Sequence, residues 1–388
     1  MPSFSLLPFS ADKSPSPLVS SLSFEATADA FAFHKTMPGY KPTELVPLPG
    51  LASSLGLGSI WLKDESTRFS LGAFKVLGAG YAIARQLLLR NKDKAFTFQA
   101  LAGKEGQEQL TFVTASDGNH GKAVAWACRE LGHKAVVLLP KGNAAIHKEW
   151  IESQGAKAYV TDENYDRTVL LAKKKSEAEG SILMQDTSWP GYEEIPLQIM
   201  HGYCTLVHEI VQALAEDKPT HVFLQAGVGS FASAMAACLA SVYPDIKIVV
   251  VEPEQVDCLY KTALYNDGML HDAGRPKETR ITSLFCGCPS WQAWEILRRT
   301  ASGFISCSDC EAALGIRTLA HPAAGDDAVR AGLAGALTTG VLKALCTDKD
   351  KTFIREKLEL DASSRVLLVS TEGAVDKAAY EQALSGQF

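Results

Sequence analysis

The segment "THVFLQAGVGSFASAMAACLASVYP", residues 220–244, passes from a strand pattern into a helix pattern through a glycine-rich turn. Its first eight residues are apolar and β-branched and predict a buried strand, whereas its last fifteen predict a helix. Gly227 and Gly229 permit a tight turn, and Ser230 begins the helix. Backbone N–H groups at such a turn, together with the helix dipole, can bind a phosphate. A tight turn without a ligand is the alternative interpretation.

The alternation of strands and helices continues through most of the chain. Buried strand patterns occupy residues 110–116, 135–140, 247–253 and 365–373, and helix patterns such as 117–134 separate them. Buried strands that alternate with helices indicate parallel sheets between helical layers, so the predicted fold class is α/β. In such sheets ligands bind at the carboxyl ends of the strands, where the glycine-rich turn also lies.

Composition narrows the classes of function. The chain of 388 residues is 46% hydrophobic and 21% charged, which is typical of a globular protein with two or three domains. A net charge of -6 argues against nucleic acid and acidic membrane surfaces as partners. No apolar run reaches the roughly 18 residues of a membrane span. We therefore expect a cytoplasmic protein that acts on a small molecule.

Nine cysteines are scattered along the chain, and four of them form two short pairs, Cys286 with Cys288 and Cys307 with Cys310. A zinc site would need all four thiolates at one point. The pattern "SCSDCEAALGIRTLA" better fits a helix that starts after Ser308, with a glutamate three residues later completing a capping box. We predict reduced thiols and no metal, with zinc as the alternative.

A second polar loop lies in "TASDGNHGKAVAWA", residues 114–127. Ser116, Asn119 and His120 offer hydrogen-bonding groups beside glycines that allow a ligand to approach closely. A loop of this kind can hold a carboxylate or flank a planar ring. The alternative is a simple helix N-terminus that is capped by Asp117.

A single lysine, Lys75, lies in the otherwise apolar run "RFSLGAFKVLGAGYA" at residues 68–82. Burial of an unpaired ammonium is costly, so we expect these surroundings to favour the neutral amine. A neutral amine near a phosphate site can form a Schiff base with an aldehyde. Pyridoxal 5'-phosphate carries both groups, and its ring accepts electrons from the Cα of an amino acid. The alternative is a lysine that extends into solvent.

Five segments of the chain, "KDESTRFSLGAFKVLGAGYA", "TASDGNHGKAVAWA", "MQDTSWPGYEEIP", "QAGVGSFASAMAA" and "VSTEG", resemble motifs of the tryptophan-synthase-like (fold type II) pyridoxal-phosphate enzymes. Within that superfamily the chain is similar to the diaminopropionate ammonia-lyases, from "FHKTMPGYKPTELVPLPGLA" to the C-terminus. The resemblance implies a homodimeric enzyme that eliminates ammonia from 2,3-diaminopropionate and yields pyruvate and two ammonia.

The resemblance also implies roles for particular residues. Lys75 would be the Schiff-base lysine and a base, Asn119 would contact the ring hydroxyl, and Thr371 would face the pyridine nitrogen. The loop from Ser116 to His120 would hold the substrate carboxylate. The implied cofactor-binding residues are Phe74, Lys75, Asn119, Gly227, Val228, Gly229, Ser230, Ser370 and Thr371, and the implied substrate-binding residues are Ser116, Asp117, Gly118, Asn119 and His120.

Two carboxylates separate the ammonia-lyases from related enzymes. Serine and threonine dehydratases carry a serine where this chain has Asp117, and Asp186 in "MQDTSW" matches a second ammonia-lyase carboxylate. An anion in either place can pair with the β-ammonium of the substrate and exchange protons. The resemblance implies that Lys75 serves the L isomer and Asp117 the D isomer. The alternative for Asp186 is a helix cap.

One feature of the family is missing. Relatives carry a Gly-Glu-Ser-Gly-Ala run before a late glycine-rich helix, whereas this chain passes from Val329 almost directly to Gly332. Asp326 or Asp327 could replace the glutamate, although neither lies at the matching place. The alternatives are therefore a pyridoxal-phosphate-binding protein with weakened or no activity, or a related serine, threonine or 3-hydroxyaspartate dehydratase.

The resemblance further implies two three-layer α/β domains with the active site in the cleft between them. We expect a large cofactor-binding domain formed by residues 21–82 and 216–388, and a small inserted domain at residues 83–215. The Ser/Pro-rich segment 1–20 is expected to be disordered.

Overall fold

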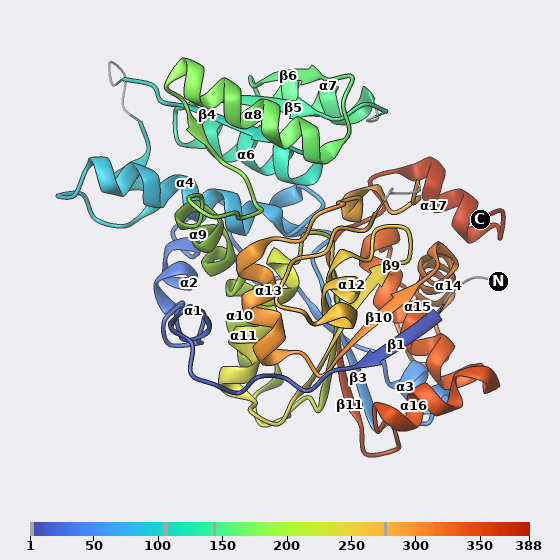
Figure 1. Ribbon diagram of the computed structural model, residues 1–388. Helices are drawn as coiled ribbons and strands as arrows, with labels where there is room; N and C mark the ends of the chain where they lie inside the picture. The colour runs from blue at the N-terminus through green and yellow to red at the C-terminus, as the bar shows by residue number, and fades with distance from the viewer. Residues whose placement is uncertain (1–3, 104–107, 143–144, 275–277) are drawn as a thin grey trace.

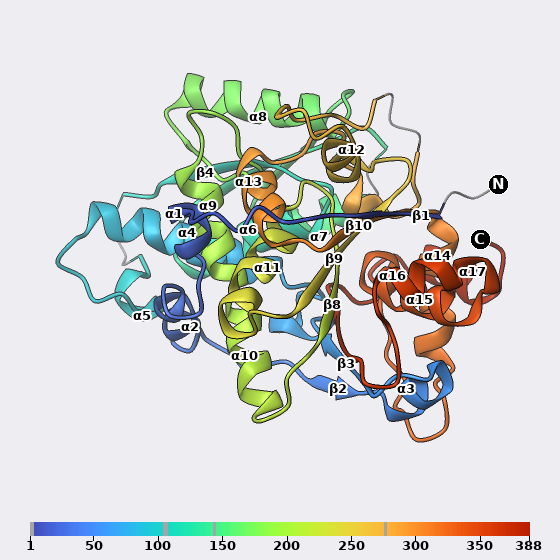
Figure 2. The same cartoon turned by 60° about the horizontal axis from the view of Figure 1, so that its bottom comes forward.

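Two sheets form the framework of the molecule (Figure 1, Figure 2). The computed structural model describes residues 4–103, 108–142, 145–274 and 278–388. The larger sheet has seven strands in the order β1-β10-β9-β8-β11-β3-β2, and the smaller has four in the order β6-β5-β4-β7. The α/β class predicted from the sequence is confirmed.

The larger sheet is parallel except at its two edges, where β1 pairs antiparallel with β10 and β2 pairs antiparallel with β3. Its strands are β1 (Phe4–Pro8), β2 (Leu45–Pro47), β3 (Ser59–Asp64), β8 (His221–Gln225), β9 (Lys247–Pro253), β10 (Gly303–Cys307) and β11 (Arg365–Ser370). Val222 and Leu224 of β8 pack on one face of the sheet, and Phe223 packs on the other. Because both faces are buried, the inner strands are apolar throughout rather than alternating.

Helices cover both faces of this sheet, and together they form the large lobe. One face carries α3 (Pro49–Leu55), α14 (Asp309–Ala320), α15 (Leu333–Thr347), α16 (Thr352–Lys357) and α17 (Lys377–Leu384), with the short η3 (Lys349–Lys351). The other carries α1 (Pro17–Ser20), α2 (Ala28–His34), α4 (Lys75–Arg90), α9 (Glu194–Tyr203), α10 (Thr205–Leu214), α11 (Ser230–Val242), α12 (Cys258–Tyr265) and α13 (Trp291–Thr300).

The smaller sheet and its helices form the small lobe, at the top of Figure 1. Its strands, all parallel, are β4 (Thr111–Ala115), β5 (Lys134–Leu139), β6 (Lys157–Val160) and β7 (Ile182–Leu183). Helices α6 (Asn119–Glu130) and α7 (Ala145–Ser153) cover one face, and α8 (Tyr165–Glu179) covers the other. The short α5 (Phe98–Leu101) follows α4 on the way into this lobe. All four strands fall within residues 83–215, but so do α9 and α10, which cover the larger sheet. The domain boundaries stay a prediction.

The N-terminal segment differs from the disorder expected for residues 1–20. Strand β1 pairs antiparallel with β10 along its whole length, and Phe9 packs edge-on against Phe304. The apolar segment "FSLLP" is short, but the open edge of the sheet satisfies its backbone hydrogen bonds. The strand was not predicted because the serine and proline residues around it give the whole segment a composition typical of disorder. Residues 1–3 lie outside the described part of the chain.

The second cysteine pair belongs to a helix start. The Ser308 hydroxyl accepts the Cys310 N–H at 3.3 Å and donates to the Glu311 carboxylate at 2.6 Å, so it caps α14. The first contact confirms Ser308 as the N-cap of α14. Glu311 contacts the Ser308 hydroxyl rather than its backbone N–H, so the described contacts do not include the reciprocal bond of the predicted capping box. Among the described residues, no group of three or more His, Cys, Asp or Glu side chains could hold a metal ion.

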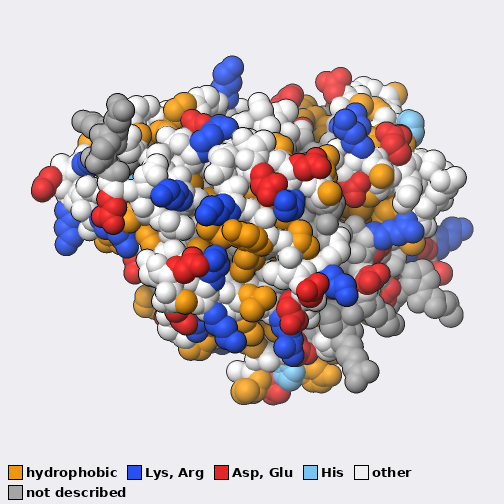
Figure 3. Space-filling model, turned by 90° about the horizontal axis from the view of Figure 1, so that it is seen from above, with side chains coloured by type: hydrophobic (Ala, Val, Ile, Leu, Met, Phe, Trp, Pro, Cys, Tyr) orange, Lys and Arg blue, Asp and Glu red, His pale blue; other side chains and the backbone are white. Residues whose placement is uncertain are grey.

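The surface carries charges of both signs. On the face in Figure 3, Lys and Arg side chains lie among Asp and Glu side chains, with hydrophobic side chains between them. Within the ranges that the structure describes, no helix has both the length and the apolar character that a membrane crossing requires.

Candidate active site

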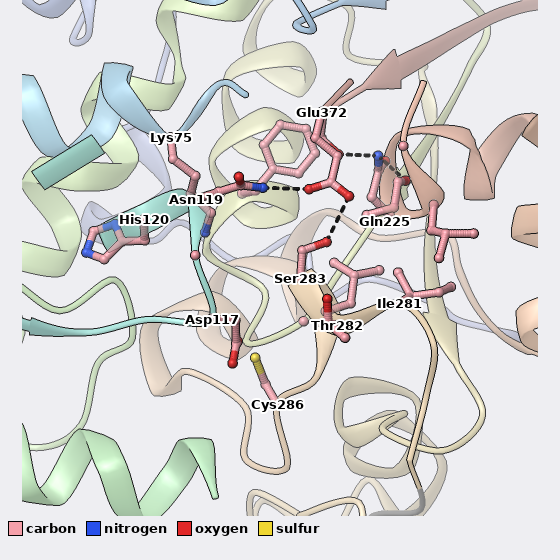
Figure 4. Close-up of a pocket in the computed structure, with 18 of the residues that line it drawn as sticks. Lys75, Asp117, Asn119, His120, Gln225, Ile281, Thr282, Ser283, Cys286 and Glu372 are labelled. Carbon is pink, nitrogen blue, oxygen red and sulfur yellow. Dashed lines mark hydrogen bonds between the residues drawn. The ribbon is translucent and has the colours of Figure 1, made fainter. Parts of the chain in front are cut away.

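A pocket lies between the two lobes, at the carboxyl ends of strands from both sheets (Figure 4). Strand β4 leads into residues 116–120, β7 into Asp186, β8 into residues 226–230, and β11 into residues 371–373. Lys75 is the first residue of α4 and also lines the pocket. In parallel α/β sheets, ligands bind at the carboxyl ends of the strands. Every predicted site residue except one lines the pocket.

The exception is Ser370, which is fully buried at the end of β11. Its hydroxyl lies 3.4 Å from the backbone oxygen of Glu372. Side chains alternate along a strand, so the next residue, Thr371, faces the pocket. Thr371 Oγ1 accepts an N–H from Gln225 at 2.9 Å, which leaves its own O–H proton for an acceptor in the pocket.

Lys75 is paired with Asp186, and its Nζ lies 2.6 Å from Asp186 Oδ2. Burial lowers the pKa of Lys75, but Asp186, together with Tyr203 and Cys286, raises it by more, so the pKa lies above its ordinary value. For Asp186, burial raises the pKa, but Lys75 and then His120 lower it by more. The expectation of a neutral amine is therefore wrong for the free side chain. Asp186 is also no helix cap, since α9 begins only at Glu194.

The loop after β4 directs Asp117 toward the pocket. The Ser116 hydroxyl accepts the N–H groups of Gly118 at 3.0 Å and Gly121 at 2.7 Å. Ser116, rather than Asp117, thus binds the N–H groups at the start of α6. Burial raises the pKa of Asp117 well above its usual range, and the negative charge of Asp186 adds to this effect.

His120 presents a lone pair beside Asp186. Its Nε2 lies 2.8 Å from the Met184 carbonyl oxygen, which can only accept, so Nε2 carries the proton. Burial lowers the pKa of His120, which favours the neutral ring. The other nitrogen, Nδ1, has no hydrogen-bond partner in the described chain and lies 3.8 Å from Asp186 Oδ2.

The glycine-rich turn forms an anion cradle at the start of α11. Gly229 has φ of +98°, and a Cβ there would lie 3.0 Å from a neighbouring alanine side chain. The backbone N–H groups of Gly227, Val228 and Gly229 have no acceptor within the described residues. The Ser230 hydroxyl donates to the backbone oxygen of Asp186 at 2.6 Å, which connects the cradle to the segment that carries Asp186. Free N–H groups at a helix N-terminus suit a phosphate.

A buried ion network supports the turn that precedes Lys75. Arg68 Nε donates to Glu65 at 2.8 Å and its Nη2 to Glu209 at 2.7 Å, and Lys63 Nζ donates to Glu209 at 2.6 Å. Two cations therefore balance two carboxylates. The two residues after Arg68 have left-handed backbone, with φ of +49° and +58°, a strained conformation for non-glycine residues. The network fixes this turn and so the start of α4.

Among the pocket residues that sequence reasoning missed are Gln225, Ser283 and Glu372. Gln225 ends β8 and Glu372 follows β11 directly, so the rule that ligands bind at strand ends could have found both. Ser283 lies in the 3-10 turn η2 (Thr282–Leu284), and no sequence signal marked it. The buried Oε1 of Gln225 has no partner among the described residues.

The segment before α15, residues 329–332, packs against the end of β11. Ala331 forms an isolated antiparallel bridge with Gly373, and the Gly332 N–H donates to the Glu372 backbone oxygen at 2.8 Å. A Cβ at Gly332 would lie 2.6 Å from the Gly373 oxygen, so the two segments meet closely.

The two aspartates near this segment do not supply a pocket carboxylate. Asp326 accepts the N–H groups of Gly50 at 2.6 Å and Leu51 at 2.8 Å, so it caps α3. Neither Asp326 nor Asp327 lines the pocket, whereas Glu372 does.

The groups in the pocket fit pyridoxal 5'-phosphate. The cradle offers free N–H groups for the phosphate, Lys75 offers an amine for the aldehyde, and Thr371 offers a hydroxyl proton for the ring nitrogen. The fold and these groups define a pyridoxal-phosphate enzyme. A family model described as "Pyridoxal-phosphate dependent enzyme" matches residues 36–372, and the chain belongs to this family. The predicted cofactor is confirmed.

Within this family the chain is similar to diaminopropionate ammonia-lyases. It is 45% identical to the Salmonella typhimurium enzyme over 364 residues, covering 91% of this chain and 90% of the relative. Identity to the Escherichia coli enzyme is 42% over 357 residues, covering 90% and 89%. The crystal structure of the Escherichia coli enzyme in complex with an aminoacrylate-PLP azomethine reaction intermediate matches with a TM-score of 0.92 and 38% identity, covering 100% of this chain and 98% of that one.

Proposed function

We propose that the chain is a pyridoxal-phosphate-dependent ammonia-lyase that performs α,β-elimination on 2,3-diaminopropionate. One substrate molecule and one water give pyruvate and two ammonia. The 42–45% identity to curated diaminopropionate ammonia-lyases supports this activity. The observation that carries the assignment is the Lys75–Asp186 pair, which lies in one pocket with Asp117 and the anion cradle.

When bound, pyridoxal 5'-phosphate supplies an electron sink for the electron pair left at the substrate Cα. The turn from Gly227 to Ser230 would hold its phosphate, and Thr371 would donate to its ring nitrogen. Asn119 would donate to the ring oxygen, and Phe74 packs at the base of the site between Tyr203 and Phe231. Lys75 would carry the aldehyde carbon.

Two groups can take the α proton. The Lys75 amine, once released from the cofactor, accepts a proton on its own side of the substrate, and we assign the L isomer to it. Asp117 has a raised pKa, which makes its carboxylate a stronger base than an ordinary aspartate. We assign the D isomer to Asp117.

Asp186 and His120 suit a substrate with a β-ammonium group. Asp186 is ionised and His120 Nδ1 offers a lone pair at 3.8 Å from it, so a cationic N–H donor can bind to both. The Ser116 hydroxyl has both acceptor contacts occupied and keeps its proton for the substrate carboxylate. When the Cβ–N bond breaks, the electron pair leaves with nitrogen, which departs as ammonia.

The direct test measures pyruvate and ammonia released from L- and D-diaminopropionate, with serine and threonine as controls. Diaminopropionate should give two ammonia per pyruvate, whereas serine gives one. Lys75→Ala should lose both turnover and the visible cofactor absorbance, and Lys174→Ala on the exposed side of α8 should keep both. Retention of the absorbance in Lys75→Ala would overturn the assignment.

The missing Gly-Glu-Ser-Gly-Ala run motivates a second candidate, a pyridoxal-phosphate-binding protein with weakened or no activity. A cofactor spectrum without pyruvate from any amino acid would favour that candidate. Preferential turnover of serine, threonine or 3-hydroxyaspartate would favour a related dehydratase. If insertion of the run raises the rate, the deletion has weakened the enzyme.

We further propose that the enzyme is a cytoplasmic homodimer. All nine cysteines are free thiols, as in proteins of reducing compartments. Leu264, Tyr265 and Met269 are exposed around the end of α12 and offer apolar area for a second copy. Light scattering of the purified protein measures the oligomeric state.

A further inference from the structure

Glu372 joins three segments that are far apart in the sequence. Its Oε2 accepts the Nδ2 hydrogen of Asn119 at 2.5 Å, and its Oε1 accepts the hydroxyl hydrogen of Ser283 at 3.1 Å (Figure 4). Asn119 begins α6 in the small lobe, whereas Ser283 lies in η2 of the large lobe. A single carboxylate at the end of β11 thus bridges the two walls of the pocket.

We propose that Glu372 is a positioning residue that fixes the orientation of the Asn119 amide toward the cofactor. An ionised carboxylate accepts hydrogen bonds and donates none, so only the NH2 end of Asn119 can face it. One of the two N–H groups is used by Glu372. The second N–H bond points about 120° away from the first and can donate to the ring oxygen of the cofactor. This inference rests on the proposed function, which places the cofactor oxygen near Asn119.

The backbone around Glu372 is held independently of its side chain. The Gly332 N–H donates to the Glu372 oxygen, and Ala331 bridges to Gly373. A Cβ at Gly335 would lie 2.5 Å from the same Glu372 oxygen, so the start of α15 also packs closely here. A substitution that keeps the shape of the side chain should therefore leave the backbone in place.

The surroundings of Glu372 make its ionisation sensitive to pH. Burial raises the pKa of Glu372, while hydrogen bonds from Ser283, Asn119 and the Ala334 N–H oppose the rise. Lys122 on α6 is the charged group that acts on it, and burial lowers the pKa of Lys122 itself. A protonated Glu372 could donate to the oxygen of Asn119 and so turn the amide over.

The test compares Glu372→Gln with the wild-type holoenzyme. Gln is isosteric but can donate as well as accept, so the amide of Asn119 loses its fixed orientation. We expect about tenfold weaker binding of pyridoxal 5'-phosphate, because a hydrogen bond to a charged group is lost. We also expect a shifted visible absorbance and, because glutamine does not titrate, an absorbance that changes less with pH on the acidic side than in the wild type. Glu381→Gln, exposed on α17, should match the wild type.

A double-mutant cycle with Asn119→Ala identifies the route of the effect. If Glu372 acts through Asn119, Glu372→Gln should change cofactor affinity little in the Asn119→Ala background. Additive losses would overturn the inference. If Glu372→Gln does not fold, Ser283→Ala serves instead, with a smaller loss that must also vanish beside Asn119→Ala. Affinity and absorbance need no turnover, so failure of the proposed reaction would not be mistaken for failure of this inference.

Discussion

Asp186→Asn should change two rates in opposite directions. The Asp186 carboxylate lies 2.6 Å from Lys75 Nζ and holds the amine in its charged form, which cannot attack an aldehyde. Asparagine keeps the shape but removes the charge, so burial alone then acts on Lys75 and lowers its pKa. We expect faster attachment of the cofactor to the cofactor-free protein, but slower elimination from diaminopropionate.

The size of the first effect follows from the pair itself. Both side chains are largely buried, with exposed fractions of 22% for Lys75 and 5% for Asp186. Removing one partner of a buried pair costs about 3–5 kcal/mol if the other stays charged. The amine avoids this cost by losing its proton, and about 3 kcal/mol corresponds to about a hundredfold more neutral amine at pH 7.

The assay follows the growth of visible absorbance after pyridoxal 5'-phosphate is mixed with the cofactor-free protein. The pH runs from about 6 to about 10, which is close to the ordinary pKa of lysine. In the wild type the rate should rise throughout this range, because the pKa of Lys75 is raised. In Asp186→Asn the rate should level off at a lower pH. Asp117→Asn changes another carboxyl of the same pocket, whose pKa is raised well above its usual range, so its effect on Lys75 should be smaller. Equal rates and equal pH profiles in wild type and Asp186→Asn would refute the reasoning.

Three further substitutions test other parts of the structure. Gly229→Ala should weaken cofactor binding in a fluorescence titration. It should also destabilise the protein by more than the strain of a left-handed backbone, about 1–2 kcal/mol, because the added Cβ would contact neighbouring side chains. Gly155→Ala is the control for strain alone, since Gly155 has φ of +80° and no atom near the position of its Cβ. Asp326→Ala should lower the unfolding free energy by about 1 kcal/mol through loss of the α3 cap, with unchanged cofactor affinity, and weakened affinity would instead place Asp326 in the site. Arg68→Met leaves Glu209 facing a single cation and should cost about 3 kcal/mol in urea denaturation; no loss would show that the network is dispensable.

Local sequence patterns were enough to predict several parts of the fold and of the pocket. The buried strand, glycine turn and helix of residues 220–244 predicted β8, the cradle and α11, because periodicity and glycine conformation act over a few residues. The polar loop before α6 and the apolar surroundings of Lys75 likewise marked the pocket. Strand alternation also predicted that these loops lie at one edge of each sheet.

Which of these groups contact one another depends on how the whole chain packs. Lys75 and Asp186 are 111 residues apart, and their pairing reverses the protonation that burial alone would impose on the lysine. Asn119 and Glu372 are 253 residues apart, and their contact joins the two walls of the pocket. Periodicity fixes which face of an element a side chain occupies, but electrostatic energy depends on the distance between atoms, and only the packed chain sets that distance.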